Sequence, residues 1–382
     1  MHRRVALFPA IALALAGALV PGGTAQAGTG TEGLDPRPVR WNAADSWSER
    51  RTVSQYWTTG RLLAARPLSA PAPQRRTQSS EPSEGSPWAT RGSSDTTTRQ
   101  TPRTTRGTGT SWAVSGTTPA ALPVTGPVSG PLTVPITGPV SGPATVQRQA
   151  LVPNSPGLQW TDDGAIVRTT GRVFFTTAEG RNASCSGSAV TSANESVVIT
   201  AGHCVKLNGA AHRNWVFVPA FDDGRSPFGT WVATRMLTTQ QWNAREDINF
   251  DLAAVVVAPL NGRTLTDVVG GQGVAFNQSR QQQMYAFGYP AAEPFDGSEL
   301  IYCSGRAFND TVMTQDQGLR CAMTGGSSGG PWFRGFDEST GLGWLNSVNS
   351  FTYNFAPNFM FGPFFGDEAM AVYQAAQNAD AL

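Results

Sequence analysis

Histidine is scarce in this chain, with three among 382 residues, and this scarcity limits the choice of a general base. His2 lies in an N-terminal segment with the features of a targeting signal, which leaves His203 and His212. His212 lies among polar and small residues, a pattern that predicts a solvent-exposed loop side chain. His203 follows the apolar run at 197–199, so it is the candidate for acid–base chemistry.

Cysteine and net charge are also low, and each shortage argues against a class of function. The four cysteines show no C-x-x-C spacing, which argues against a zinc site. The formal net charge of +1 gives no reason to expect a nucleic-acid partner. We therefore expect no metal, no cofactor and no nucleic acid.

Long apolar runs are absent after residue 20. The apolar stretch at 5–20 follows basic residues and precedes Ala-Gln-Ala at 25–27, a pattern typical of a secretory signal peptide. This stretch is too short to span a bilayer comfortably. We predict a signal peptide at 1–27 and a secreted, extracellular mature protein without a membrane anchor.

Residues 28–118 are poor in apolar side chains and rich in Ser, Thr, Pro, Gly and Arg. Such a composition cannot offset the entropy lost on ordering, so we predict a low-complexity leader or pro-segment. One island, from Trp41 to Leu68, carries recurring aromatic and apolar residues. It is either a short pro-segment that contacts the rest of the protein or part of an unstructured leader.

Two composition changes follow the leader. Residues 119–159 carry a proline at every fourth position from 119 to 143, which predicts an extended Pro/Gly-rich linker. Residues 160–382 alternate short strand-like runs with turn residues, the pattern of an all-β domain. This length suits two small barrels that share a cleft, or one large β domain. Acidic residues followed by helix formers predict a helix at 367–376.

Residues 324–331 read Thr-Gly-Gly-Ser-Ser-Gly-Gly-Pro, a sequence suited to a sharp bend. Its glycines let a carbonyl approach the main chain without meeting a Cβ. Successive N–H groups in such a bend can point at one position, as an oxyanion hole requires. Ser328 is therefore the candidate nucleophile, with His203 as the base that accepts its proton.

Two segments resemble the signatures of trypsin/chymotrypsin-like serine peptidases of the secreted actinobacterial type. They are Thr-Ala-Gly-His-Cys at 200–204 and Gly-Ser-Ser-Gly-Gly-Pro at 326–331, where Ser327 replaces the usual aspartate. The resemblance covers residues 160–382. It implies two six-stranded antiparallel β-barrels, an active site in the cleft between them and a C-terminal helix.

The resemblance also implies a function. We expect a monomeric serine endopeptidase that hydrolyses polypeptides through a Ser-His-Asp triad and an acyl-enzyme intermediate, made as a zymogen. Two alternatives stay open. The same triad would serve an esterase, and a peptidase fold without catalysis would serve as a binding protein.

The third triad member is an acid between His203 and Ser328 in the sequence. Asp251 heads the apolar run at 252–257, where a carboxylate is costly to bury unless it is paired, and a histidine N–H is a suitable partner. Asp247 is the rival, but its polar surroundings suit a residue that caps a turn. Family patterns also favour Asp251.

Four cysteines in an exported protein suggest two disulfides, with three possible pairings. The resemblance favours Cys185–Cys204, beside the catalytic histidine, and we favour Cys303–Cys321 as the second.

The resemblance assigns the finer parts of the site. The oxyanion hole is expected at the backbone N–H groups of Gly326 and Ser328. The specificity pocket is expected at Ala322, Met323, Ser347, Val348 and Asn349, with Ser350 at the end of its wall. None of these is acidic, which disfavours an Arg or Lys preference and favours a small or apolar substrate side chain. Ser327 carries no charge to bind a newly freed N-terminus, so we expect local hydrogen bonds and the Cys303–Cys321 bridge to form the catalytic loop.

Overall fold

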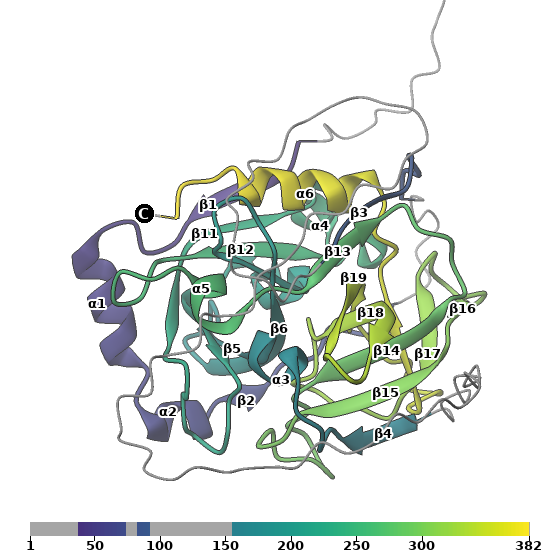
Figure 1. Cartoon of the computed structure of the whole chain (residues 1–382), viewed down its shortest axis with the longest axis horizontal. Coiled ribbons are helices and arrows are strands. Elements are labelled where there is room, and N and C mark those ends of the chain that lie inside the picture. Colours follow the sequence, from purple (N-terminus) through teal and green to yellow (C-terminus); the bar gives the residue numbers. More distant parts are fainter. Residues whose placement is uncertain (1–36, 74–81, 92–154, 382) are drawn as a thin grey trace, which may run out of the picture. The chain divides into compact units, whose positions relative to one another are not determined.

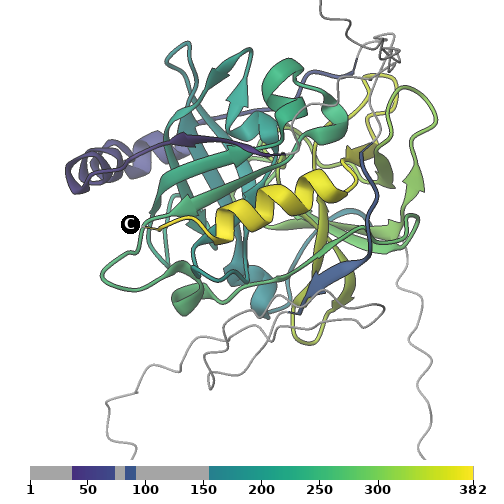
Figure 2. The ribbon, with the colours of Figure 1, turned by 90° about the horizontal axis from the view of Figure 1, so that it is seen from above.

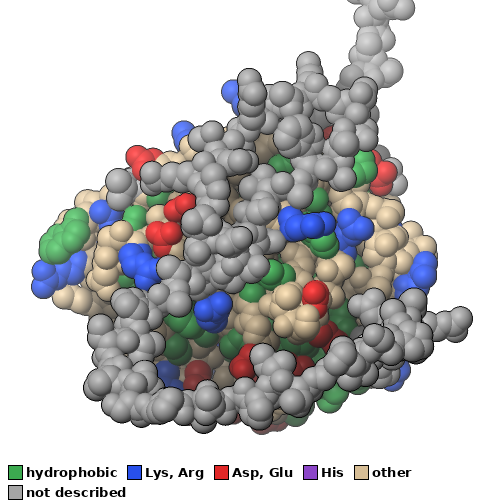
Figure 3. Space-filling view, viewed as in Figure 1, with side chains coloured by type: hydrophobic (Ala, Val, Ile, Leu, Met, Phe, Trp, Pro, Cys, Tyr) green, Lys and Arg blue, Asp and Glu red, His purple; other side chains and the backbone are tan. Residues whose placement is uncertain are grey.

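The computed structural model describes residues 37–73, 82–91 and 155–381. The predicted signal peptide and residues 119–154 of the predicted linker lie outside them. Short strands predominate in the described residues (Figure 1). Basic and acidic side chains are interspersed on the face shown in Figure 3. None of the described helices has the length and apolar composition needed to cross a membrane.

Six strands close the first barrel, each paired antiparallel with its neighbours. Around the barrel they are β5 (Thr170–Thr176), β6 (Asn182–Val190), β7 (Val197–Thr200), β12 (Ala253–Val257), β11 (Trp231–Thr238) and β10 (Arg213–Pro219). All five residues of β12, Ala-Ala-Val-Val-Val, are buried. Each buried valine contributes about 1.5–3 kcal/mol, so the apolar run that predicted this strand also forms the barrel core.

The second barrel consists of two sheets. The larger contains β13 (Gly273–Phe276), β19 (Leu342–Val348), β18 (Pro331–Asp337), β14 (Gln283–Gly288) and β15 (Ile301–Arg306), and its β13–β19 pair is parallel. The smaller contains β16 (Phe308–Asn309), β17 (Gln317–Arg320) and β20 (Phe359–Gly362). β17 packs beside β15. A disulfide joins Cys303 in β15 to Cys321, the residue directly after β17. The predicted all-β, double-barrel fold is confirmed.

The C-terminal helix α6 (Asp367–Gln377) agrees with the prediction for 367–376. It contacts β11 and β12, and Figure 2 shows it lying across the strands. Its buried residues, Ala369, Val372, Tyr373 and Ala376, form the apolar face that holds it there.

Leader residues add strands to both barrels. β1 (Val39–Asn42) pairs with the part of β11 that β10 leaves free, and β3 (Trp88–Thr90) pairs with β13. Between them lie α1 (Trp47–Tyr56), α2 (Thr59–Leu63) and β2 (Arg66–Pro67), along the edge of the first barrel (Figure 1). Of the two alternatives for the island at 41–68, the structure shows the one that contacts the rest of the protein.

Residues 155–159 form β4 (Ser155–Gln159) at the edge of the second barrel, and not the end of the predicted linker. Pro156 lacks an N–H donor, but an edge strand tolerates this loss. The Pro-rich composition therefore did not exclude a strand here. The folded part after the gap begins at least by residue 155, before the predicted boundary at 160.

Candidate active site

Ser328 lies in the loop between β17 and β18, where the two barrels meet. The glycines on either side are required by close approaches. Gly329 has φ +78°, and a Cβ there would lie 2.1 Å from Thr200 Oγ1 of the first barrel. A Cβ at Gly330 would lie 2.0 Å from the carbonyl oxygen of Phe287. Both approaches exclude larger residues.

His203 lies in the short 3-10 helix η1 (Gly202–Cys204), directly after β7. Its side chain is fully buried. The ring of Trp242 packs against Gly202, where a Cβ would lie 2.7 Å from a ring carbon. The glycine before His203 therefore lets the turn pack directly on Trp242.

Asp251 precedes β12 and is fully buried, with three hydrogen bonds that offset the cost of burying a carboxylate. Its Oδ1 accepts the backbone N–H of His203 at 2.8 Å, and its Oδ2 lies 2.8 Å from His203 Nδ1. Oδ2 also accepts the hydroxyl of Ser350 at 2.5 Å. Asp247 instead caps a turn, where its Oδ1 accepts the Asn249 N–H at 3.3 Å. The structure thus brings Asp251, and not Asp247, to His203.

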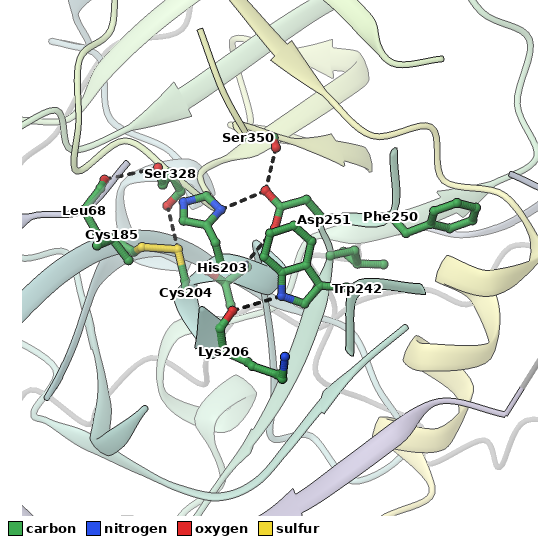
Figure 4. Close-up of polar contacts among 12 residues, drawn as sticks. Leu68, Cys185, His203, Cys204, Lys206, Trp242, Phe250, Asp251, Ser328 and Ser350 are labelled. Carbon is green, nitrogen blue, oxygen red and sulfur yellow. Dashed lines mark hydrogen bonds and ion pairs between the residues drawn. A yellow bond between two sulfur atoms is a disulfide. The ribbon is translucent and has the colours of Figure 1, made fainter. Parts of the chain in front are cut away.

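The His203 ring lies between Asp251 and Ser328 (Figure 4). Its Nε2 is buried and has no hydrogen-bond partner among the described residues. The Ser328 hydroxyl donates to the carbonyl oxygen of Leu68 at 3.3 Å, and the Gly326 N–H donates to the same oxygen at 3.0 Å. A leader carbonyl is therefore bound by both the candidate nucleophile and a predicted oxyanion donor. The role of the Ser328 N–H in the oxyanion hole stays a prediction.

Local hydrogen bonds hold the serine loop. The Ser327 hydroxyl donates to the Thr324 carbonyl at 2.7 Å, and the Ser186 hydroxyl donates to the Gly326 carbonyl at 2.9 Å. The Asn349 amide donates to the Ser327 carbonyl at 3.0 Å. Local hydrogen bonds of this kind are expected from the sequence, because position 327 carries no charged residue.

Both favoured disulfides are present. Cys185–Cys204 joins β6 to the residue after His203, and Cys303–Cys321 joins β15 to the chain that leads into the serine loop. In the part of the chain that the structure describes, Cys185, Cys204 and His203 are the one group with metal-ligand spacing. Its two sulfurs are bonded to each other, so they offer no thiolate to a metal.

The residues assigned to the specificity pocket are mostly enclosed. Ser347, Val348 and Asn349 are fully buried, and Met323 is 2% exposed. Asn349 Nδ2 also donates to the Phe287 carbonyl at 2.9 Å, so this side chain braces the serine loop. Ala322 is half-buried. Their assignment to the pocket stays a prediction.

His212 differs from the prediction of a solvent-exposed loop residue. It is 4% exposed, stacks on Phe175 at 4.3 Å between ring centroids, and its Nε2–H donates to the His203 carbonyl at 3.0 Å. Burial, and to a smaller degree the neighbouring His203, lower the pKa of His212 to about 4, although the hydrogen bond to the His203 carbonyl opposes this shift. The polar residues around His212 in the sequence therefore gave no indication that it is buried and contacts His203.

Three contributors to the site were missed at the sequence level: His212, Ser350 and Leu68. Ser350 was expected only at the end of the pocket wall, and nothing local indicates that its hydroxyl reaches Asp251. Leu68 was noticed only as the end of the apolar island. The Ser350–Asp251 and Leu68–Ser328 contacts join residues far apart in the chain, so only the fold reveals them.

Comparisons with known proteins agree with this geometry. Residues 185–340 match the family model described as a trypsin-like peptidase domain. The chain is similar to the protease Anisep from Arthrobacter nicotinovorans, with 43% identity, 58% of this chain and 100% of Anisep covered, and a TM-score of 0.54. It is also similar to AL20, a thermostable serine protease from an extremophilic microorganism, with 45% identity, 56% and 100% coverage, and a TM-score of 0.53.

No curated protein matches the chain in a sequence comparison. The two solved proteases are nevertheless covered over their full length, and this chain shares their fold. With its fold, its matching family model and these two relatives, the chain belongs to the trypsin-like serine peptidases and is a serine-type endopeptidase.

Proposed function

We propose that this protein is a secreted endopeptidase that cleaves polypeptides with Ser328 as nucleophile, His203 as general base and Asp251 as the group that orients the histidine. The observation that carries the proposal is the 2.8 Å contact between two fully buried groups, His203 Nδ1 and Asp251 Oδ2. Ser350 and the His203 backbone N–H fix the carboxylate further. These contacts leave Nε2 as the ring nitrogen available to the serine.

The reaction proceeds in two stages. When Ser328 Oγ attacks the substrate carbonyl carbon, its proton passes to His203 Nε2 and the carbonyl electrons move onto oxygen. The Gly326 N–H stabilises this oxyanion, and Asp251 stabilises the imidazolium. His203 then protonates the leaving amine as the peptide bond breaks. Water, deprotonated by His203, hydrolyses the acyl-enzyme and restores Ser328.

Secretion is part of the proposal. Two disulfides in a protein of this family support an oxidising compartment, and residues 1–27 have the composition of a signal peptide. The names of the two relatives, a protease and a serine protease, favour peptides over simple esters as substrates. The intact His203–Asp251 pair argues against a binding protein without catalysis.

Ser328→Ala tests the assignment, with Ser327→Ala as the matched control. The purified chain is incubated with a fluorophosphonate to completion, the modified peptide is mapped by mass spectrometry, and casein and ester hydrolysis are measured. We expect the label on Ser328, and hydrolysis lowered on the order of 10⁴-fold in Ser328→Ala. Ser327→Ala should still be labelled. A label on Ser327, or full activity in Ser328→Ala, would contradict the assignment.

A further inference from the structure

The end of the island at 41–68 passes over the serine loop. β2 pairs in parallel with β6, along the edge of β6 that the shorter β7 leaves free, and Pro67 lies opposite Ser184. The Leu68 N–H then donates to the Ser184 carbonyl at 2.9 Å. Ala70 packs against the apolar cluster that contains Phe351. Residues 66–70 thus pass from the first barrel, over the serine loop, to the second.

The Leu68 carbonyl engages two groups that the proposed mechanism needs. It accepts the Gly326 N–H and the Ser328 hydroxyl. The Ser328 hydroxyl is hydrogen-bonded to this oxygen and not to His203 Nε2, which has no partner among the described residues. Attack requires transfer of the hydroxyl hydrogen to Nε2. The bound leader therefore holds the nucleophile in an unreactive arrangement.

The leader is anchored away from the cleft. Trp57, 5% exposed, donates its Nε1–H to the Asn214 carbonyl at 2.6 Å and packs on Phe174. The Tyr56 hydroxyl donates to Asn182 Oδ1 at 2.8 Å, and Leu62 is 2% exposed. These contacts keep Leu68 at a high effective concentration beside Ser328.

We propose that residues 66–70 are an inhibitor built into the chain, which occupies the cleft, diverts the Ser328 hydroxyl from His203 and stays uncut. This inference rests on the proposed roles of Ser328 and His203. Cleavage of the Leu68–Ser69 bond would need Ser328 Oγ to attack the Leu68 carbonyl carbon after losing its proton to His203. The observed hydrogen bond runs from Oγ to the carbonyl oxygen instead, so that bond is not activated.

The test compares full-length variants by their rate of fluorophosphonate labelling at Ser328 and of ester hydrolysis. Leu68→Pro removes the N–H that binds Ser184. Trp57→Ala loosens the remote anchor instead. Loss of one or two hydrogen bonds corresponds to roughly a five- to thirtyfold effect. We expect both variants to react at least about fivefold faster than the unmodified chain.

Leu63→Ala is the matched control, because Leu63 lies in the same leader but is 52% exposed. It should react at the unmodified rate. Circular dichroism verifies that each variant is folded. A synthetic peptide of residues 64–71 provides a second test, in which inhibition of ester hydrolysis by the added peptide is measured. This test does not require the Trp57→Ala substitution. The peptide should slow ester hydrolysis by Leu68→Pro, whereas the same peptide with proline at 68 should not.

The outcomes separate the two proposals. If the unmodified chain and all folded variants are labelled at one fast rate on Ser328, the inhibitor is overturned and the proposed nucleophile stands. A leader fragment that ends at Leu68 in the mass spectrum would show that the segment is a substrate, which also overturns the inhibitor. If no folded variant is labelled at Ser328, the proposed function fails, and the inhibitor fails with it.

Discussion

His212 contacts His203, the proposed general base, through the His203 backbone carbonyl. Because its pKa is about 4 in the folded protein, it stays neutral at neutral pH and keeps the tautomer with hydrogen on Nε2. A protonated His212 would place a charge in a site that is 4% exposed. Protonation of His212 at low pH should therefore destabilise the fold next to His203.

We predict that His212 makes the fold less stable as the pH falls from about 6.5 to 4. Its folded pKa, about 4, lies below the ordinary 6.5, so its contribution is complete above pH 6.5 and is lost as the pH falls toward 4. His212→Asn keeps a side-chain N–H donor but cannot titrate. The free energy of unfolding is measured with urea at pH 7.5 and at pH 4. Its decrease between these two pH values should be smaller in the variant by about 2–3 kcal/mol.

The comparison uses the difference between the two pH values, so a constant cost of the substitution cancels. His203 and every carboxyl group are present in both proteins, and their effects cancel as well. An equal decrease in the two proteins would show that His212 does not carry this pH dependence.

At the scale of residues, the sequence was most informative where the chemistry limits the choice. Three histidines and one Gly-Ser-Ser-Gly-Gly segment were enough to single out His203 and Ser328. Asp251 followed from its place at the head of an apolar run. The supporting contacts of Ser350 and Asn349 could not be predicted, since their side chains resemble any other polar side chain until the barrels fold.

At the scale of elements, the turn that carries His203 depends on one packing contact. The Trp242 ring is 1% exposed, and its Nε1–H donates to the Lys206 carbonyl at 3.0 Å. The ring therefore has little freedom to move away from Gly202. The turn and helix α4 (Gln240–Arg245), which carries Trp242, act as one unit that places the histidine.

We predict that Gly202→Ala displaces this turn, because its Cβ would lie 2.7–2.9 Å from three ring atoms of Trp242. Overpacking of this kind costs about 1–3 kcal/mol. The labelling rate of Ser328 should fall roughly tenfold or more, because His203 is adjacent and small displacements impair proton transfer. Thermal unfolding and labelling kinetics measure the two effects.

Two further variants sharpen this prediction. Gly60→Ala is the control, since nothing lies within 4 Å of a Cβ at that helical position, and it should leave both measurements almost unchanged. Trp242→Leu should restore part of the loss when combined with Gly202→Ala, giving a non-additive pair. Additive effects would mean that the clash is not the cause.

Most strands were predictable because their apolar runs are flanked by turn residues, as in β7 and β12. β13 could not be predicted from its local sequence, because it begins at Gly273, shortly after Gly270 and Gly271, which indicate a turn, and its partners β3 and β19 lie far away in the sequence. β4 was missed because its proline suggested a linker. In both cases pairing within the sheet outweighed a local preference.

At the scale of the whole molecule, the catalytic loop is set without a charged residue at 327. Residues 165–168, the stretch closest to a typical processed N-terminus, lie inside the helix α3 (Ala165–Thr169), where Ile166 is fully buried. We predict that the identity of any new N-terminus does not affect activity. To test this, a recognition site for a sequence-specific protease is introduced within residues 92–154. The folded chain is then cut at that site, which creates a defined new N-terminus.

Two such chains should be compared, which differ by one extra residue at the new N-terminus. Their labelling rates at Ser328 should agree within about twofold, since no ion pair depends on that terminus. The double variants with Leu68→Pro provide a faster background for the same comparison. If labelling requires one of the two termini and disappears with the added residue, a terminal switch exists and the argument from Ser327 is wrong.

The leader strands β1, β2 and β3 pair with β11, β6 and β13 respectively, so they would not leave the protein when the chain is cut beyond residue 91. The product would be a two-chain complex, whose dissociation depends on its concentration. Before the cut the inhibitor is covalently tethered, so dilution does not change the inhibited fraction of the enzyme. After the cut the inhibited fraction depends on the concentration of the complex. Dilution into the surroundings would then turn the enzyme on, and the time at which the chain is cut would decide when dilution begins to matter.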